Sequence, residues 1–159
     1  MKSVFIGVLA FGLAQMSSAQ SIQSSREACG FTAQELEAAL GVKLEAGRGS
    51  EMAFPGGKQF TCTYRAHGSV SVLLTQMRMD NPQIAADAHD RFKAGSMELI
   101  VGDPDKARWQ LGQGDLTAVT LHYQRSGTDV QVRVQGVDVK NRNAVEAMRA
   151  RVLKLRRLP

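Results

Sequence analysis

Two stretches of the chain alternate apolar and polar residues with a period of two, the pattern of strands that have one buried and one exposed face. The first covers residues 60–74 and is interrupted by a turn around Gly68. The second covers residues 119–134 and is interrupted by a turn around Gly127. Alternation on both sides of a glycine-containing turn predicts a β-hairpin in each stretch.

Three segments have the spacing of amphipathic helices. The first begins after Thr32, which forms a capping box with Glu35, and ends at Gly41, a residue suited to a left-handed helix stop. The second begins near Pro82, and the third follows Asn141, a good N-cap residue. The apolar stripes of these two helices consist of Ile84, Ala88 and Phe92, and of Val145, Met148, Val152 and Leu155.

Each hairpin is followed by a helix, and the two hairpin–helix units resemble each other. Tyr64 and Tyr123 occupy corresponding positions in them. We therefore predict an internal duplication with approximate repeats 29–98 and 99–159, although two hairpins of this common pattern can also be similar by chance. The fold class that we predict is α+β, an antiparallel sheet with helices packed on one face.

The N-terminal residues 1–19 have the pattern of a secretory signal peptide. A positively charged start is followed by an apolar run at 4–14, which is too short to span a bilayer, and by small residues up to Ala19. An uncleaved anchor is the alternative. Cleavage near Ala19 would leave a flexible tail at 20–28 and a single domain at 29–159. We expect a periplasmic or secreted bacterial protein without a transmembrane segment in its mature chain.

The chain contains two cysteines, Cys29 and Cys62. Exported proteins meet an oxidising compartment, so we predict that these two residues form a disulfide. The chain-entropy model gives such a loop about 3–4 kcal/mol of stabilisation. A pair of buried free thiols is the alternative, while two cysteines without paired histidines do not have the spacing of a zinc site.

The formal net charge of +5 comes largely from the C-terminal end, where residues 140–159 hold seven Lys and Arg but one Glu. Arg142, Arg149 and Arg156 recur every seven residues and would form one row on the last helix. The row could line the rim of a packed helix. Alternatively, it could attract an anionic partner, either lipid headgroups or an acidic protein. Nucleic acid is not expected, because no aromatic residues are interleaved to stack bases.

The single tryptophan, Trp109, lies between the two predicted units and is preceded by Arg108. One interpretation is an aromatic side chain half-buried at a strand edge. The other is an anchor for a binding partner, with Arg108 at its rim, because tryptophan is enriched in binding hot spots.

No catalytic or metal-binding motif is recognisable in the sequence. His67, His89 and His122 are not at metal-ligand spacing, and neither a zincin motif nor a serine-nucleophile motif is present. Asp103 and Asp105 flank a proline but offer too few oxygen ligands for calcium. We therefore expect no catalytic residues, no metal and no cofactor.

Several short motifs resemble a known family. They are the helix opened by a cysteine and closed by Leu-Gly at 40–41, the Cys-x-Tyr strand at 62–64, the Gly-x-Gly-Asp turn at 112–115, and the final hairpin and helix. Together they resemble small exported bacterial proteins of a domain-of-unknown-function family that is common among actinobacterial secreted lipoproteins. This chain lacks the lipoprotein cysteine. The resemblance covers most of the mature chain and implies no activity.

The function expected from these observations is that of an exported, non-catalytic binding protein of the bacterial periplasm. Its partner would be another protein or an anionic envelope component. An immunity or inhibitor protein directed against a toxin or a wall hydrolase is a narrower alternative. An enzyme whose site is assembled from distant residues is the rival, and a deep pocket with interacting His, Asp and Glu groups would favour it. A flat apolar patch around Trp109 would favour protein binding.

Overall fold

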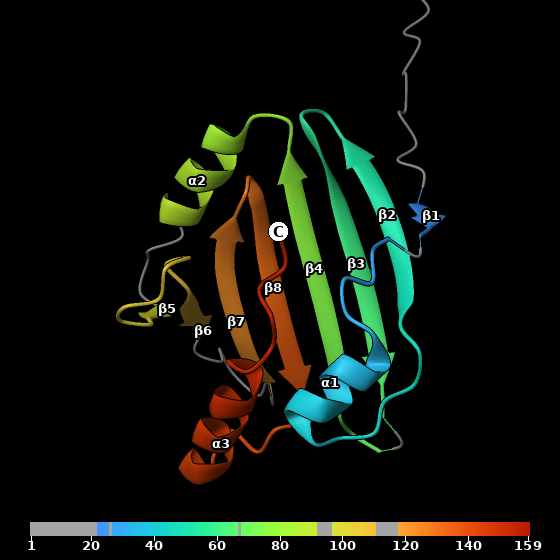
Figure 1. Ribbon diagram of the computed structural model, residues 1–159, viewed down its shortest axis with the longest axis vertical. Coiled ribbons are helices and arrows are strands. Elements are labelled where there is room, and N and C mark those ends of the chain that lie inside the picture. The colour runs from blue at the N-terminus through green and yellow to red at the C-terminus, as the bar shows by residue number, and fades with distance from the viewer. Residues whose placement is uncertain (1–21, 26, 67, 92–96, 111–117) are drawn as a thin grey trace, which may run out of the picture.

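The computed structural model describes residues 22–25, 27–66, 68–91, 97–110 and 118–159. This part of the chain forms one antiparallel sheet of eight strands, in the order β1-β2-β3-β4-β8-β7-β6-β5, together with three helices (Figure 1). The strands are β1 (Ile22–Ser24), β2 (Arg48–Phe54), β3 (Gly57–Arg65), β4 (Ser71–Met79), β5 (Met97–Leu99), β6 (Arg108–Gln110), β7 (Ala118–Arg125) and β8 (Thr128–Gln135). The helices are α1 (Ala33–Leu40), α2 (Pro82–Arg91) and α3 (Arg142–Val152). The predicted α+β class and antiparallel sheet are confirmed.

Both predicted hairpins are present, as β3–β4 and β7–β8. The turn of the second hairpin places Ser126 and Gly127 at φ 50° and 77°. Positive φ at both central residues suits the two-residue turns that match the twist of paired strands. The two hairpins are joined into one sheet by the pairing of β4 with β8. His67, in the first turn, lies outside the described residues.

One face of the sheet carries the main hydrophobic core. The strand residues that point to it are fully or nearly fully buried, and α1, α3 and the C-terminal tail lie over them (Figure 1). Complete burial of each large apolar side chain is worth about 1.5–3 kcal/mol. The strand residues of this core include Cys62, Tyr64, Val72, Leu74, Leu121, Tyr123, Val130, Val132 and Val134.

The first helix has the ends that its sequence predicts. The Glu35 N–H donates to Thr32 Oγ1 at 3.1 Å, and the Thr32 N–H donates to Glu35 Oε2 at 2.7 Å, which is a complete capping box. Gly41 closes the helix in the left-handed region, with φ of 69°. The Asn141 side chain caps α3 by accepting from the Ala144 N–H at 3.2 Å.

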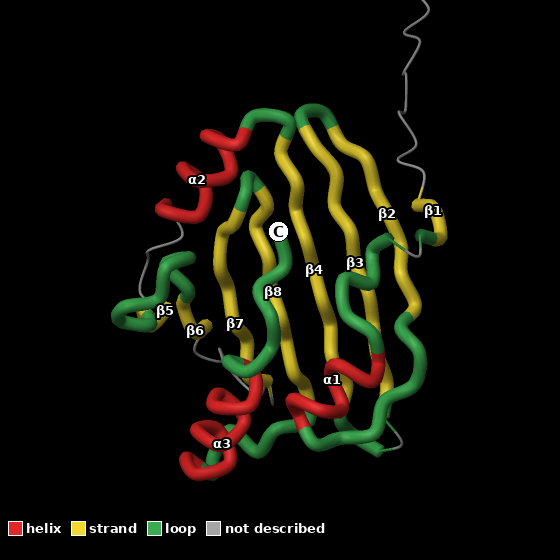
Figure 2. The backbone as a smooth tube through the Cα atoms, viewed as in Figure 1, coloured by secondary structure: helices red, strands yellow, loops and turns green. Residues whose placement is uncertain are grey.

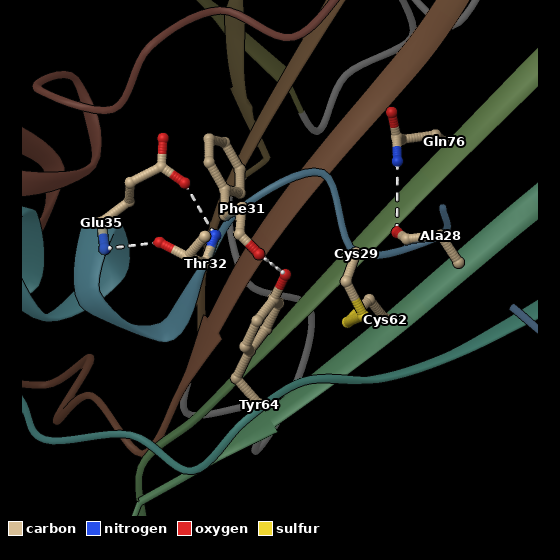
Figure 3. The surroundings of a disulfide bond; sticks show 8 residues. All are labelled: Ala28, Cys29, Phe31, Thr32, Glu35, Cys62, Tyr64 and Gln76. Carbon is tan, nitrogen blue, oxygen red and sulfur yellow. Dashed lines mark hydrogen bonds between the residues drawn. A yellow bond between two sulfur atoms is a disulfide. The ribbon is translucent and has the colours of Figure 1, made fainter. Parts of the chain in front are cut away.

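The predicted disulfide joins Cys29 to Cys62, with 5.1 Å between the two Cα atoms (Figure 3). It fastens the segment that precedes α1 to the centre of β3. The loop before β2 must approach the bridge closely, because a Cβ on Gly47 would lie 2.6 Å from Cys62 Sγ and 2.9 Å from Cys29 Sγ. Glycine at this position is therefore required by packing against the disulfide.

Two side-chain hydrogen bonds add to the bridge on the same segment (Figure 3). The Tyr64 hydroxyl donates to the Phe31 carbonyl at 2.6 Å, and the Gln76 amide donates to the Ala28 carbonyl at 3.3 Å. Burial raises the pKa of Tyr64 to about 12, so the phenol stays protonated and remains a donor.

Helix α2 meets the sheet differently from α1 and α3. It contacts β4, β8 and β7, and its His89 Nδ1 lies 3.1 Å from Asp129 Oδ2. Asp129 precedes the core residue Val130, so its side chain points to the opposite face of the sheet. The helices after the two hairpins thus occupy different positions. The internal duplication is not confirmed, although Leu73 does lie opposite Arg133, as two-fold-related repeats would place them.

The N-terminal region differs in part from the prediction. Residues 22–24, expected to belong to a flexible tail, pair with β2 as strand β1. The predicted signal peptide lies outside the described residues. Among the helices of the described ranges, none is long and apolar enough to cross a membrane.

Candidate functional site

Trp109 lies in the core and not at a binding surface. It is 5% exposed, pairs with Leu121 across β6 and β7, and is covered by α3, whose Arg149 guanidinium lies 5.3 Å from the centre of its ring. A side chain buried in this way has no surface free for a partner. The interpretation of Trp109 as a binding anchor is therefore wrong. The sequence did not indicate its burial because a strand of three residues is too short to show an alternating pattern.

Arg108 points away from Trp109, because successive residues of a strand face opposite sides of the sheet. It is buried, and its Nη1 donates to the His89 carbonyl at 2.8 Å. It therefore links β6 to α2 and is not a rim residue around Trp109.

The predicted row of basic residues on the last helix does not form. Helix α3 ends at Val152, so Arg156 lies beyond it. The Arg149 side chain is 14% exposed and forms ion pairs with Glu98 and Glu146, at 3.0 and 3.2 Å. Of the three arginines, Arg142 alone is exposed and forms no ion pair with another described residue.

After α3 the chain continues as a tail, residues 153–159, which crosses over β8 on the core face (Figure 2). Leu158 is 2% exposed, and its N–H donates to the Tyr123 hydroxyl at 2.9 Å. The Arg157 guanidinium lies 4.7 Å from the centre of the Tyr123 ring and is bonded to Asp103. This part of the basic tail thus holds the C-terminal end and the 103–105 loop against the core.

Arg156 fastens the same tail to α1. Its guanidinium donates to Glu35 Oε1 at 2.7 Å and to the Gly30 carbonyl, and it lies 5.3 Å from the centre of the Phe31 ring. The hydrogen bond from Arg156, with that from Thr32, lowers the pKa of Glu35 to about 2.

The depressed pKa of Glu35 predicts a dependence of stability on pH. A carboxylate whose pKa is lower in the folded state contributes stability above its unfolded pKa, and this contribution is lost as the pH falls through the folded pKa. The loss should therefore occur between about pH 4.5 and pH 2. Urea unfolding of the parent and of Glu35→Gln across this range checks it: the variant should show a flatter dependence, and equal slopes would contradict the assignment.

The second face of the sheet carries the side chains that alternate with the core residues. On β2, β3 and β4 they are mostly polar or of medium size and partly exposed, and Met77 reaches 38% exposure. Among the described helices, α2 alone contacts this face, through His89. The residues of this face on the three strands include Arg48, Ser50, Met52, Gln59, Thr61, Thr63, Arg65, Leu73, Thr75 and Met77. We call this surface the open face.

Charges on the open face are unbalanced. Three arginines that are exposed or partly exposed point to it, namely Arg48, Arg65 and Arg133. Arg108 faces the same side but is buried against α2 and does not contribute to this surface. Among the described strand residues, Asp129 is the one acid on this face, and it is already in contact with His89. The open face is therefore positively charged.

On β6, β7 and β8 the open face carries a compact polar cluster. His122 Nε2 lies 3.1 Å from Gln110 Oε1 and 2.9 Å from Gln131 Nε2. Burial is the main cause that lowers the pKa of His122, so the ring is neutral at neutral pH. Thr120 lies between Gln110 and Arg133 in the strand register.

Arg133 in this cluster was not singled out from the sequence. It sits at a polar position of an alternating strand, where a solvated side chain is the ordinary expectation. In the structure its Nε is shielded from solvent and has no hydrogen-bond partner in the described part of the chain. The residues paired with it, Leu73 and Thr120, are not acids, but the pairing with Leu73 on β4 is visible only in the structure.

Two hollows lined by described residues lie at the disulfide and beside α2. A hollow of about 540 Å³ adjoins the disulfide and is lined by Ser24, Ser25, Cys29, Gly47, Arg48 and Gly49. A smaller one of about 100 Å³ is lined partly by His89 and Asp105. Within the described ranges, no group of three His, Cys, Asp or Glu side chains could hold a metal ion.

No family model, no curated protein and no solved structure matches the chain. The resemblance to the domain-of-unknown-function family remains a hypothesis that rests on the short motifs alone.

Proposed function

We propose that this protein is an exported, non-catalytic binding protein of the bacterial periplasm, and that the open face of its sheet binds another protein. The observation that carries the proposal is the unequal covering of the two faces. The core face is covered by α1, α3 and the tail, whereas the open face is partly exposed and carries a net positive charge.

The size of the open face supports a protein partner. Five neighbouring strands, β2, β3, β4, β8 and β7, are seven to nine residues long. With about 3.3 Å per residue and about 4.8 Å between strands, they present roughly 550–700 Å². A stable protein–protein interface takes about 800 Å² from each partner. The excess of arginine favours a partner with an acidic surface, because complementary charge speeds encounter and selects the partner.

Export is supported by the disulfide and by the signal-peptide pattern of the sequence. The Cys29–Cys62 bridge is present, and such bridges persist in oxidising compartments such as the periplasm.

Site-specific photocrosslinking in the producing cell tests the binding face. A photoreactive phenylalanine analogue at Thr75, which lies on the open face, should give adducts with a protein partner. The same analogue at Gln34, an exposed position of α1 on the other side of the molecule, is the matched control. Adducts from Gln34 but not from Thr75 would place the interface elsewhere. Adducts with lipid or glycan alone would replace the protein partner by an envelope component.

A further inference from the structure

Arg133 is a partly buried cation that has no partner in the described part of the chain. Its Nε is shielded from solvent and unbonded, and its guanidinium forms no hydrogen bond, ion pair or ring contact with another described residue. Other arginines of similar burial are matched, Arg149 by Glu98 and Arg157 by Asp103. A shielded donor without an acceptor is costly, and an acceptor that approached the partly exposed guanidinium from outside the chain could remove that cost.

The polar side chains that flank Arg133 on the open face of β8 are bonded to other residues. The Gln131 amide nitrogen lies 2.9 Å from His122 Nε2, and Gln135 Oε1 accepts from the Ser71 hydroxyl at 2.9 Å. The two residues directly opposite Arg133 are Leu73 on β4 and Thr120 on β7, and neither is an acid.

Arg133 also lies where an interface anchor is expected. It is on β8, which pairs with β4 at the middle of the eight-stranded order. Partly exposed Leu73 and Thr75 lie beside it on β4. Binding energy concentrates in central residues, arginine prominent among them, that are surrounded by contacts which exclude water.

We propose that Arg133 is the anchor of the open face and binds a carboxylate of an acidic protein partner. The planar guanidinium matches a carboxylate through two parallel hydrogen bonds, which is stronger and more directional than a contact to a point charge. The inference rests on the proposed function in that the carboxylate is taken to come from a protein.

The first experiment uses the isolated mature protein and a defined probe. The ¹⁵N-labelled protein is titrated at low ionic strength with acetyl-triglutamate amide while the arginine Nε–Hε signals are recorded. The Arg133 signal is identified by its loss in Arg133→Gln. We expect a saturable shift of this signal, with half-saturation in roughly the millimolar range. No shift of the Arg133 signal up to about 50 mM peptide would overturn the proposal.

Matched variants and probes sharpen the result. Arg48→Gln removes another cation of the open face and should leave the titration close to that of the parent. Arg133→Lys keeps the charge but loses the planar fork, so backbone shifts at Thr120 should need several-fold more peptide. Inorganic phosphate and phosphatidylglycerol vesicles are the competing probes. If phosphate or the vesicles shift the Arg133 signal as strongly as the peptide does, the assignment of a carboxylate ligand is overturned.

A second readout separates this inference from the proposed function. Arg133→Gln should reduce the yield of Thr75 photoadducts at least ten-fold, whereas Arg48→Gln should reduce it much less. Equal adduct yields in the parent and in Arg133→Gln would leave the open face as the interface but remove Arg133 as its anchor. A peptide response at Arg133 without any Thr75 adduct would support the carboxylate site and contradict the proposed protein interface.

Discussion

Breaking the Cys29–Cys62 disulfide should lower the free energy of unfolding by about 3–4 kcal/mol. The two residues are separated by 33 positions, and a loop of this length loses much of its conformational freedom in the unfolded chain when it is closed. The loss is a large part of the roughly 5–15 kcal/mol that stabilises a domain of this size.

Urea unfolding of the oxidised and the reduced protein measures this effect. The double variant Cys29→Ala with Cys62→Ala is the control, and its stability should not respond to reductant. Alanine is preferred to serine because Cys62 is fully buried, and a hydroxyl there would lack a hydrogen-bond partner. A difference of less than about 1 kcal/mol between oxidised and reduced protein would show that the bridge contributes little beyond the contacts around it.

Local patterns in the sequence predicted the local structure well. The two hairpins, the capping box of Thr32 and Glu35, the stop at Gly41 and the Cys29–Cys62 bridge are all present. Each of these depends on residues close in sequence, or on the single possible pairing of two cysteines. Period-two alternation also assigned the buried and open faces, because it depends only on the backbone geometry of a strand.

The same patterns could not predict contacts between residues that are far apart in the sequence. The sequence predicts that the apolar stripe of the last helix extends to Leu155, but the helix ends at Val152 and the tail carries Leu155 and Leu158 into the core. The partners of Arg156 lie on α1, more than a hundred residues away. A helical wheel shows only which residues share a face of a helix, and therefore could not show that this arginine serves to fasten the tail.

The candidate site could not be predicted from local sequence patterns either. Arg133 has the appearance of an ordinary polar strand residue, and its missing counter-charge becomes visible only when β4 and β7 are placed on either side of it. Trp109 is the reverse case. Residue type alone left a binding role open, and the pairing of its short strand with β7 places it in the core.

Replacing Trp109 by alanine should lower the free energy of unfolding by about 3–5 kcal/mol and leave partner binding intact. The variant removes a large buried ring between the sheet and α3, and it also removes the aromatic face beneath the Arg149 guanidinium. Trp109→Phe keeps an aromatic ring and should lose much less.

Two measurements separate the core role of Trp109 from a binding role. Urea unfolding gives the loss of stability, and the yield of Thr75 photoadducts, taken at a temperature where the variant is folded, gives binding. Because Trp109 faces the core and Thr75 faces the open side of the sheet, the adduct yield should match that of the parent. A variant with parental stability and few adducts would contradict the burial of Trp109 and return it to the interface.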